Sequence, residues 1–88
     1  MPRIVATHTV NDVNHWASKG DERVEILGQF ATDIVSYVAA DGSNQVAVSA
    51  NLHNMEGMMA WMQTPEAAAA MGSHGVIPPV VFHIEAAE

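Results

Sequence analysis

Residues 31–53, ATDIVSYVAADGSNQVAVSANLH, predict a β-hairpin near the centre of this 88-residue chain. The run Ile34-Val35-Ser36-Tyr37-Val38 is rich in β-branched and aromatic residues, and residues 45–53 alternate between larger apolar and smaller or polar side chains. Between the two lies Asp41-Gly42-Ser43-Asn44, which has the composition of a tight turn. We therefore expect antiparallel strands over residues 31–40 and 45–53.

The segment before the hairpin predicts a strand followed by a helix. Residues 3–10 are β-branched and roughly alternating, and the following Asn11-Asp12 can cap a helix. Apolar residues then recur at near-helical spacing as far as Leu27, and Gly28 is a natural stop. Gly20 lies in the middle of this helix, where we expect a kink or a break.

The segment after the hairpin predicts a helix in two parts and a last strand. Asn54 is a favourable cap, and Thr64-Pro65 begins a second helical segment that we expect to end at Met71, before Gly72. We expect Gly75 and Pro78-Pro79 to lie in a loop, and residues 80–84 to form the last strand.

The resulting order, βαββαβ, predicts a ferredoxin-like α+β fold in a single domain that spans residues 1–88. Its four-stranded antiparallel sheet carries two helical segments on one face, because right-handed crossovers place both on the same side. The strands place few charged residues on the other face of the sheet, so we expect that face to be buried against another chain. Since 49% of the residues are hydrophobic and only 15% are charged, we expect a second copy of the chain to cover it as a homodimer.

Composition limits the range of partners. Ten acidic against three basic residues give a formal charge of −7, which repels phosphate backbones and anionic lipids, so neither nucleic acid nor membrane is expected. An anionic substrate would need Arg3, Lys19 or Arg23 at the mouth of its pocket. The chain has no cysteine, which excludes thiolate nucleophiles and cysteine-ligated metals. We see neither a secretion signal nor an apolar run of membrane-spanning length and expect a cytoplasmic protein.

Two motifs support a resemblance at the level of a family. The first is a histidine in the first strand followed by residues 10–16, Val-Asn-Asp-Val-Asn-His-Trp, and the second is residues 64–71, Thr-Pro-Glu-Ala-Ala-Ala-Ala-Met, followed by Gly75-Val76 and Pro78-Pro79. With these motifs the chain resembles the small dimeric α+β-barrel proteins, which include antibiotic-biosynthesis monooxygenases and muconolactone isomerase. The resemblance implies a dimer whose two sheets close a barrel, and a small-molecule pocket between the sheet and the helices of each subunit. It assigns no reaction, because this fold carries many chemistries.

His8 is the first candidate for a catalytic residue. It shares a strand face with Ile4, Ala6 and Val10, and this apolar face is expected to point toward the helices. A neutral imidazole there can act as a general base, because the ordinary histidine pKa lies near neutrality. The alternative is a core histidine that is hydrogen-bonded to the backbone or to water.

The other four histidines fall in different places. His74, between Gly72 and Gly75, is expected in a flexible loop that can close over a pocket as a second catalytic residue, or else it is an ordinary exposed loop histidine. His53 and His83 alternate with the apolar strand positions, so we expect them on the opposite face of the sheet at the subunit interface, or else in a polar layer between the sheets or exposed to solvent. His15 is expected on the surface of the first helix.

Methionines spaced three or four residues apart surround Trp61. This stripe can fill gaps in the core, form an adaptable wall for an aromatic ligand, or bind a soft metal. The histidines lack a short metal-binding spacing, so we predict no metal site and no cofactor, and a haem site would need an axial histidine that nothing singles out. For a small apolar or aromatic ligand we predict a wall made of Met58, Trp61, Tyr37 and Phe82.

Two classes of function remain open. The first is a cofactor-free monooxygenase or isomerase in which His8, helped by His74, removes a proton from a small aromatic or polyketide-like molecule. The second is a non-catalytic dimeric module that binds a small ligand or is purely structural.

Overall fold

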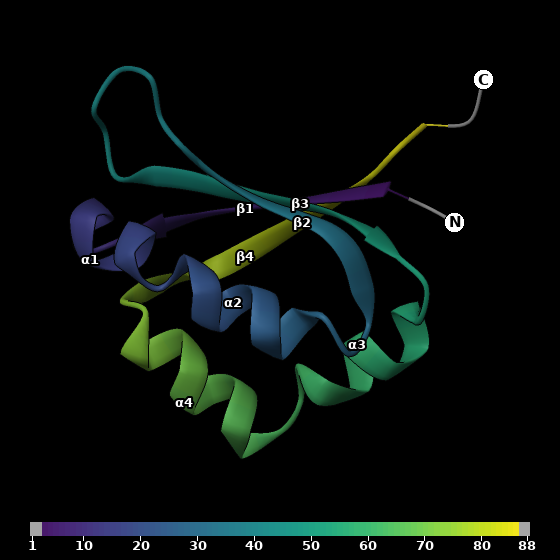
Figure 1. Cartoon of the computed structure of the whole chain (residues 1–88). Helices are drawn as coiled ribbons and strands as arrows, with labels where there is room; N and C mark the ends of the chain where they lie inside the picture. Colours follow the sequence, from purple (N-terminus) through teal and green to yellow (C-terminus); the bar gives the residue numbers. More distant parts are fainter. Residues whose placement is uncertain (1–2, 87–88) are drawn as a thin grey trace.

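Strands and helices alternate along the computed structural model, which describes residues 3–86 (Figure 1). The elements in chain order are β1 (Arg3–Val10), α1 (Val13–Ser18), α2 (Gly20–Leu27), β2 (Ala31–Val38), β3 (Gln45–Leu52), α3 (Met55–Trp61), α4 (Pro65–Ser73) and β4 (Val76–Ile84). The strands form one antiparallel sheet in the order β2-β3-β1-β4. The predicted ferredoxin-like α+β fold is therefore confirmed.

The central hairpin forms as predicted, with slightly shorter strands. Gly42 adopts a positive φ of 81°, and the Ser43 backbone N–H donates to the Asp41 carboxylate at 2.9 Å. β3 ends at Leu52, and just beyond it the N–H groups of His53 and Asn54 both donate to the Phe30 carbonyl, at 2.9 and 3.1 Å. β2 ends at Val38, two residues earlier than expected.

Both predicted helical regions are interrupted and capped. The first breaks at Lys19, between α1 and α2, which confirms the break expected at Gly20. In the second, the side chains of Asn54 and Thr64 accept backbone N–H groups at the starts of α3 and α4. α4 runs on through Gly72 to Ser73, so the predicted end at Met71 was two residues too early.

The last strand corrects a second expectation. β4 begins at Val76, so Pro78-Pro79 lies within the strand and not in a loop. β4 is an edge strand, and the prolines fall where its pairing with β1 is irregular, between the pairs Thr7↔Val81 and Thr9↔Ile77. An edge or a bulge tolerates proline because no ladder hydrogen bond is lost there. This bulge lies directly opposite His8.

The core lies between the sheet and the helices. Every second residue of β1 is buried, and these residues share the interior with Trp16, Leu52 and Met58. Phe82, on β4, packs against the same core from its edge. The helix-facing residues of β1 and β3 pair directly with each other, as in Ile4↔Ala50 and His8↔Val46.

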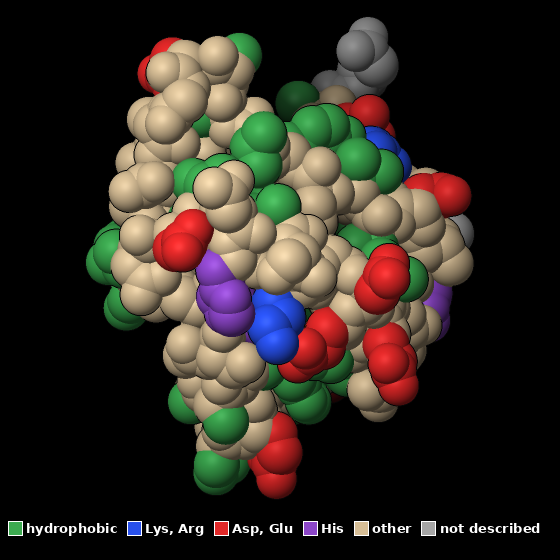
Figure 2. All heavy atoms as spheres, turned by 60° about the vertical axis from the view of Figure 1, so that its left-hand side comes forward, with side chains coloured by type: hydrophobic (Ala, Val, Ile, Leu, Met, Phe, Trp, Pro, Cys, Tyr) green, Lys and Arg blue, Asp and Glu red, His purple; other side chains and the backbone are tan. Residues whose placement is uncertain are grey.

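The opposite face of the sheet has no helix over it among the described residues (Figure 1). The exposed side chains of Val35, Tyr37 and Val81 belong to this face, since they pair with Ser49, Ala47 and Thr7 respectively. Figure 2 shows hydrophobic side chains reaching the surface in the upper part of the molecule, and others at its left and lower edges. We call the sheet face that carries Val35, Tyr37 and Val81 the open face of the sheet. None of the helices within residues 3–86 is long and apolar enough to cross a membrane.

Candidate active site

A cavity of about 120 Å³ lies between the helix-facing side of the sheet and the helices. Its wall is almost entirely apolar and is made of side chains from the strands and from all four helices. Among the apolar lining residues are Ile4, Ala6, Val48, Ala50 and Phe82 from the strands, Trp16, Ile26, Leu27, Met58, Trp61 and Met71 from the helices, and Met62 at the C-terminal cap of α3. Three polar side chains complete the wall: His8, Arg23 and His74.

His8 is buried in this wall, with only 8% of its surface exposed. Neither of its ring nitrogens has a hydrogen-bond partner among the described residues. Its ring meets the Trp16 ring edge-on, at a centroid distance of 5.8 Å and an angle of 71°. Burial lowers the pKa of His8, and the positive charge of Arg23 lowers it further. At neutral pH the imidazole is therefore uncharged and keeps one nitrogen free to accept a proton.

Arg23 is the buried cation of the site, with 7% of its surface exposed. Its guanidinium carbon lies 3.7 Å from the centroid of the Trp16 ring, in cation–π contact. Nη1 donates to the Trp16 carbonyl at 2.7 Å, and Nε donates to the Ser36 hydroxyl at 3.2 Å. Burial lowers the pKa of Arg23, although an arginine remains protonated in such surroundings.

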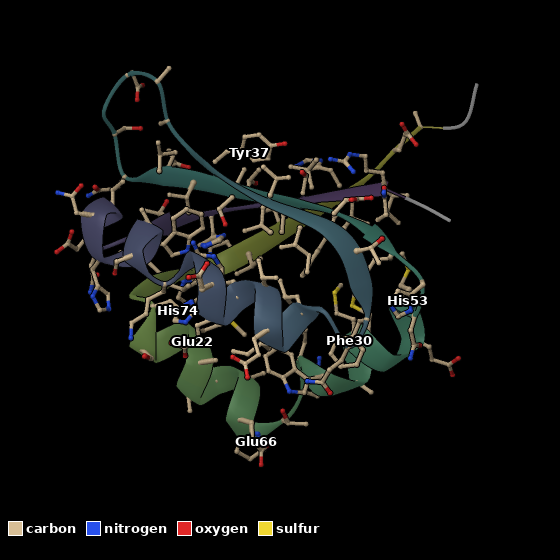
Figure 3. The ribbon with its side chains drawn as sticks, in the orientation of Figure 1. Glu22, Phe30, Tyr37, His53, Glu66 and His74 are labelled. Atoms are coloured by element: carbon tan, nitrogen blue, oxygen red, sulfur yellow. The ribbon has the colours of Figure 1, made fainter. Side chains whose placement is uncertain are left out.

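His74 lies at the C-terminal cap of α4 and is 4% exposed. Its Nδ1 is 3.4 Å from Arg23 Nη1, and its Nε2 is 3.4 Å from a carboxylate oxygen of Glu22, a charge contact without hydrogen-bond geometry. Figure 3 shows His74 and Glu22 facing each other between α4 and α2. Burial lowers the pKa of His74, and the Glu22 carboxylate opposes that shift. His74 thus connects the buried Arg23 with a carboxylate at the surface.

The structure brings most of the predicted site residues together. His8, His74, Met58, Trp61 and Phe82 all line the same cavity. His74 is fixed at a helix end, whereas the sequence suggested a flexible loop.

Tyr37, which we expected in the ligand wall, lies on the open face of the sheet instead (Figure 3). It is 46% exposed, and its hydroxyl hydrogen-bonds to that of Ser49 at 3.0 Å. The alternation of strand side chains explains this placement, because the neighbouring Ser36 already points to the helix side, where it contacts Arg23. Tyr37 is therefore not part of this cavity.

The remaining histidines are exposed and lie outside the cavity. His53 follows the end of β3. His83, on β4, pairs with Val5 of β1 and lies on the open face. His15 is at the surface of α1, and its Nε2 lies 2.7 Å from the Ser73 carbonyl. Among residues 3–86, no group of three or more histidine or carboxylate side chains is placed to hold a metal ion.

The sequence named Arg23 only as one of three basic residues that could lie at the mouth of a pocket, and it did not predict that the charge is buried. A charged residue between Glu22 and Val24 suggests a solvent-exposed helix face. Its spacing held a signal, since it stands four residues before Leu27, which places both residues on one face of α2. Only the packing against Trp16 shows that the charge itself is buried.

Comparison with solved structures identifies the fold class. A proposed antibiotic biosynthesis monooxygenase from Bordetella bronchiseptica matches with a TM-score of 0.68 at 10% identity, over 99% of this chain and 96% of that chain. One from Deinococcus radiodurans gives 0.60 at 14% identity, over 100% and 93%. A further antibiotic biosynthesis monooxygenase gives 0.61 at 6% identity, over 100% and 99%.

No family model and no curated protein matches the sequence. The chain therefore shares the ferredoxin-like α+β fold of antibiotic biosynthesis monooxygenase-type proteins, and the resemblance is confirmed at the level of the fold. Because these identities are low, the reaction has to be argued from the site.

The buried, uncharged His8 predicts that acid destabilises the protein. As the pH falls from 7 to 5 the unfolded chain binds a proton at this histidine before the folded protein does, so the free energy of unfolding decreases, by at most about 1.4 kcal/mol per pH unit for one such group. Urea unfolding at both pH values should show a smaller loss for His8→Gln than for the wild type. His53→Gln, which removes an exposed histidine, is the matched control. An unchanged loss in His8→Gln would show that His8 is not the group responsible.

Proposed function

We propose that the cavity is the active site of a cofactor-free monooxygenase or isomerase that acts on a small aromatic or polyketide-like molecule, with His8 as its general base. The observation that carries the proposal is the state of His8: buried, uncharged at neutral pH, and without a hydrogen-bond partner at either ring nitrogen among the described residues. A histidine that serves only structure usually has such partners. A base that awaits a substrate does not need them.

The size and lining of the cavity support a small aromatic substrate. An apolar cavity of roughly 150 Å³ is known to bind benzene, so about 120 Å³ suits a single ring. A larger, polyketide-like molecule would place one ring inside and extend through the opening. The wall of Met58, Trp61 and Phe82 contributes adaptable and aromatic surface for such a ring.

The chemical step begins with proton transfer. His8 accepts a proton from an acidic C–H or O–H group, and the bonding electron pair remains on the substrate as an enolate or phenolate. In an isomerase, the imidazolium returns the proton to another atom of the same anion. In a monooxygenase, dioxygen is the oxidant: a CH₂ group becomes C=O, one oxygen atom enters the product, and the other leaves as water with both hydrogens.

Arg23 supports this step electrostatically. Its charge disfavours protonated His8 before the reaction, which keeps the base free. The same charge stabilises the anion that forms on the substrate, because the site is buried and the local dielectric is low. His74 lies between Arg23 and the surface carboxylate of Glu22 and helps to position the guanidinium.

We also propose that two copies of the chain pair through the open face of the sheet. Val35, Tyr37 and Val81 expose large apolar surfaces there, which a monomer of this size gains by burying. The fold's resemblance to dimeric barrel proteins supports the same arrangement. Each cavity lies on the helix side, so the pairing completes the protein without closing the site.

Replacing the proposed base tests the enzymatic function. His8→Gln should lower kcat by about 10²- to 10⁴-fold while the ligand still binds, because glutamine keeps the polarity of the side chain but cannot accept the proton. Oxygen uptake and product analysis over a panel of small phenols and cyclic diketones measure turnover, and NMR measures binding. His53→Gln is the matched control and should keep wild-type turnover.

Two outcomes would contradict this function. Full turnover in a folded His8→Gln variant would remove His8 from the mechanism. Binding without turnover over the whole panel, by a wild-type protein with an intact fold, would favour the second candidate, a non-catalytic ligand-binding module, to which the apolar lining is equally suited.

The pairing has its own test in Val81→Asp. A charge within a buried apolar interface costs several kcal/mol, so native mass spectrometry should show a dimer for the wild type and a monomer for this variant. Val24→Asp, at an exposed position on α2, is the matched control and should remain dimeric. A monomeric wild type would overturn the proposed pairing.

A further inference from the structure

We infer that the cavity binds its ligand as an anion, with a carboxylate or phenolate oxygen held by the guanidinium of Arg23. The inference rests on the proposed function only in using the same cavity, and it names the class of ligand: a single-ring aromatic molecule that carries a negative charge on oxygen.

The first argument is the charge of Arg23, which is only partly compensated. Among the described residues, the Glu22 carboxylate lies 3.6 Å from the Lys19 ammonium and 3.4 Å from Nε2 of the uncharged His74 imidazole. Glu22 raises the pKa of Arg23 from farther away, and no carboxylate of the described residues lies within 4.0 Å of the guanidinium. Its contacts are a backbone carbonyl, a hydroxyl, an imidazole nitrogen and the face of Trp16, all formally neutral. A buried charge without an opposite charge is costly, and an anionic ligand removes that cost.

The second argument is the kind of polar atom that lacks a partner. Arg23 Nη2 and Trp16 Nε1 are buried and have no hydrogen-bond acceptor among the described residues. Both groups can only donate. They belong to two stacked side chains of the cavity lining, so two donors without a partner lie just behind its apolar surface. An anionic oxygen is the strongest acceptor a small ligand can offer.

The third argument is the surroundings of the guanidinium, which are apolar and small. Gly20 adds no side chain beside Nη2, where a Cβ would be 3.8 Å away. Apart from His8 and His74, the cavity lining is apolar and encloses a space of single-ring size, so the guanidinium is the positive charge that an anionic group on the ligand can approach there. The formal charge of −7 would otherwise repel an anion, but exposed carboxylates are screened by water and salt, whereas a buried guanidinium is not.

The test compares two isosteric ligands. Titration calorimetry on the wild-type protein at neutral pH measures the affinity for benzoate and for benzamide, which have the same shape but differ in charge. A charge-assisted hydrogen bond predicts that benzoate binds about tenfold to a hundredfold more tightly. A parallel titration with para-nitrophenolate shows whether a phenolate serves as well as a carboxylate.

The variants assign the preference to one residue. Arg23→Gln should abolish the preference for benzoate, Arg23→Lys should keep part of it, and Lys19→Gln, which removes the same charge outside the cavity, should keep all of it. If Arg23→Gln fails to fold, the wild-type comparison and Arg23→Lys still decide.

Equal or tighter binding of benzamide, binding of neither ligand, or an undiminished preference in folded Arg23→Gln would overturn the inference. Benzoate has no acidic hydrogen left to lose, so the result does not depend on turnover, and failure of the proposed reaction would leave it standing.

Discussion

The stacking of Arg23 on Trp16 is the contact on which the rest of the site depends. A guanidinium carbon 3.7 Å from the indole centroid ties α2 to α1, and the hydrogen bond to Ser36 and the contact with His74 extend the same group to β2 and α4. Cation–π contact contributes about 2 kcal/mol when desolvated, whereas burial of a charge costs several. The protein therefore holds this charge at a net cost, which is typical of functional sites.

That constraint explains the chemistry available in the cavity. The charge of Arg23 and the apolar wall both act against protonation of His8, so this base stays uncharged at neutral pH. The bulge of β4 opposite His8 interrupts the sheet beside this residue and brings Val80 and Phe82 into the wall. A cation, a free base and an apolar wall are the parts needed to stabilise a carbanion or a phenolate away from water.

The sequence predicted the fold well where local chemistry decides it. The turn at Gly42, the caps at Asn54 and Thr64 and the break near Gly20 all follow from local preferences that tertiary contacts leave unchanged. The loop predicted at the two prolines of β4 was wrong, because an edge strand tolerates proline and only the assembled sheet shows that β4 is at the edge. Alternation placed His8 correctly, whereas Tyr37 was assigned by residue type and lies on the other face. The burial of Arg23 could not be predicted, because it depends on packing between separate helices.

The protonation state of His8 tests the central claim most directly. Long-range ¹H–¹⁵N NMR of the imidazole, assigned by comparison with His8→Gln, reports whether one or both ring nitrogens carry a proton. The account predicts an uncharged ring at neutral pH whose nitrogen signals shift when an aromatic anion occupies the cavity. A doubly protonated ring at neutral pH, or signals that a saturating ligand leaves unchanged, would contradict it.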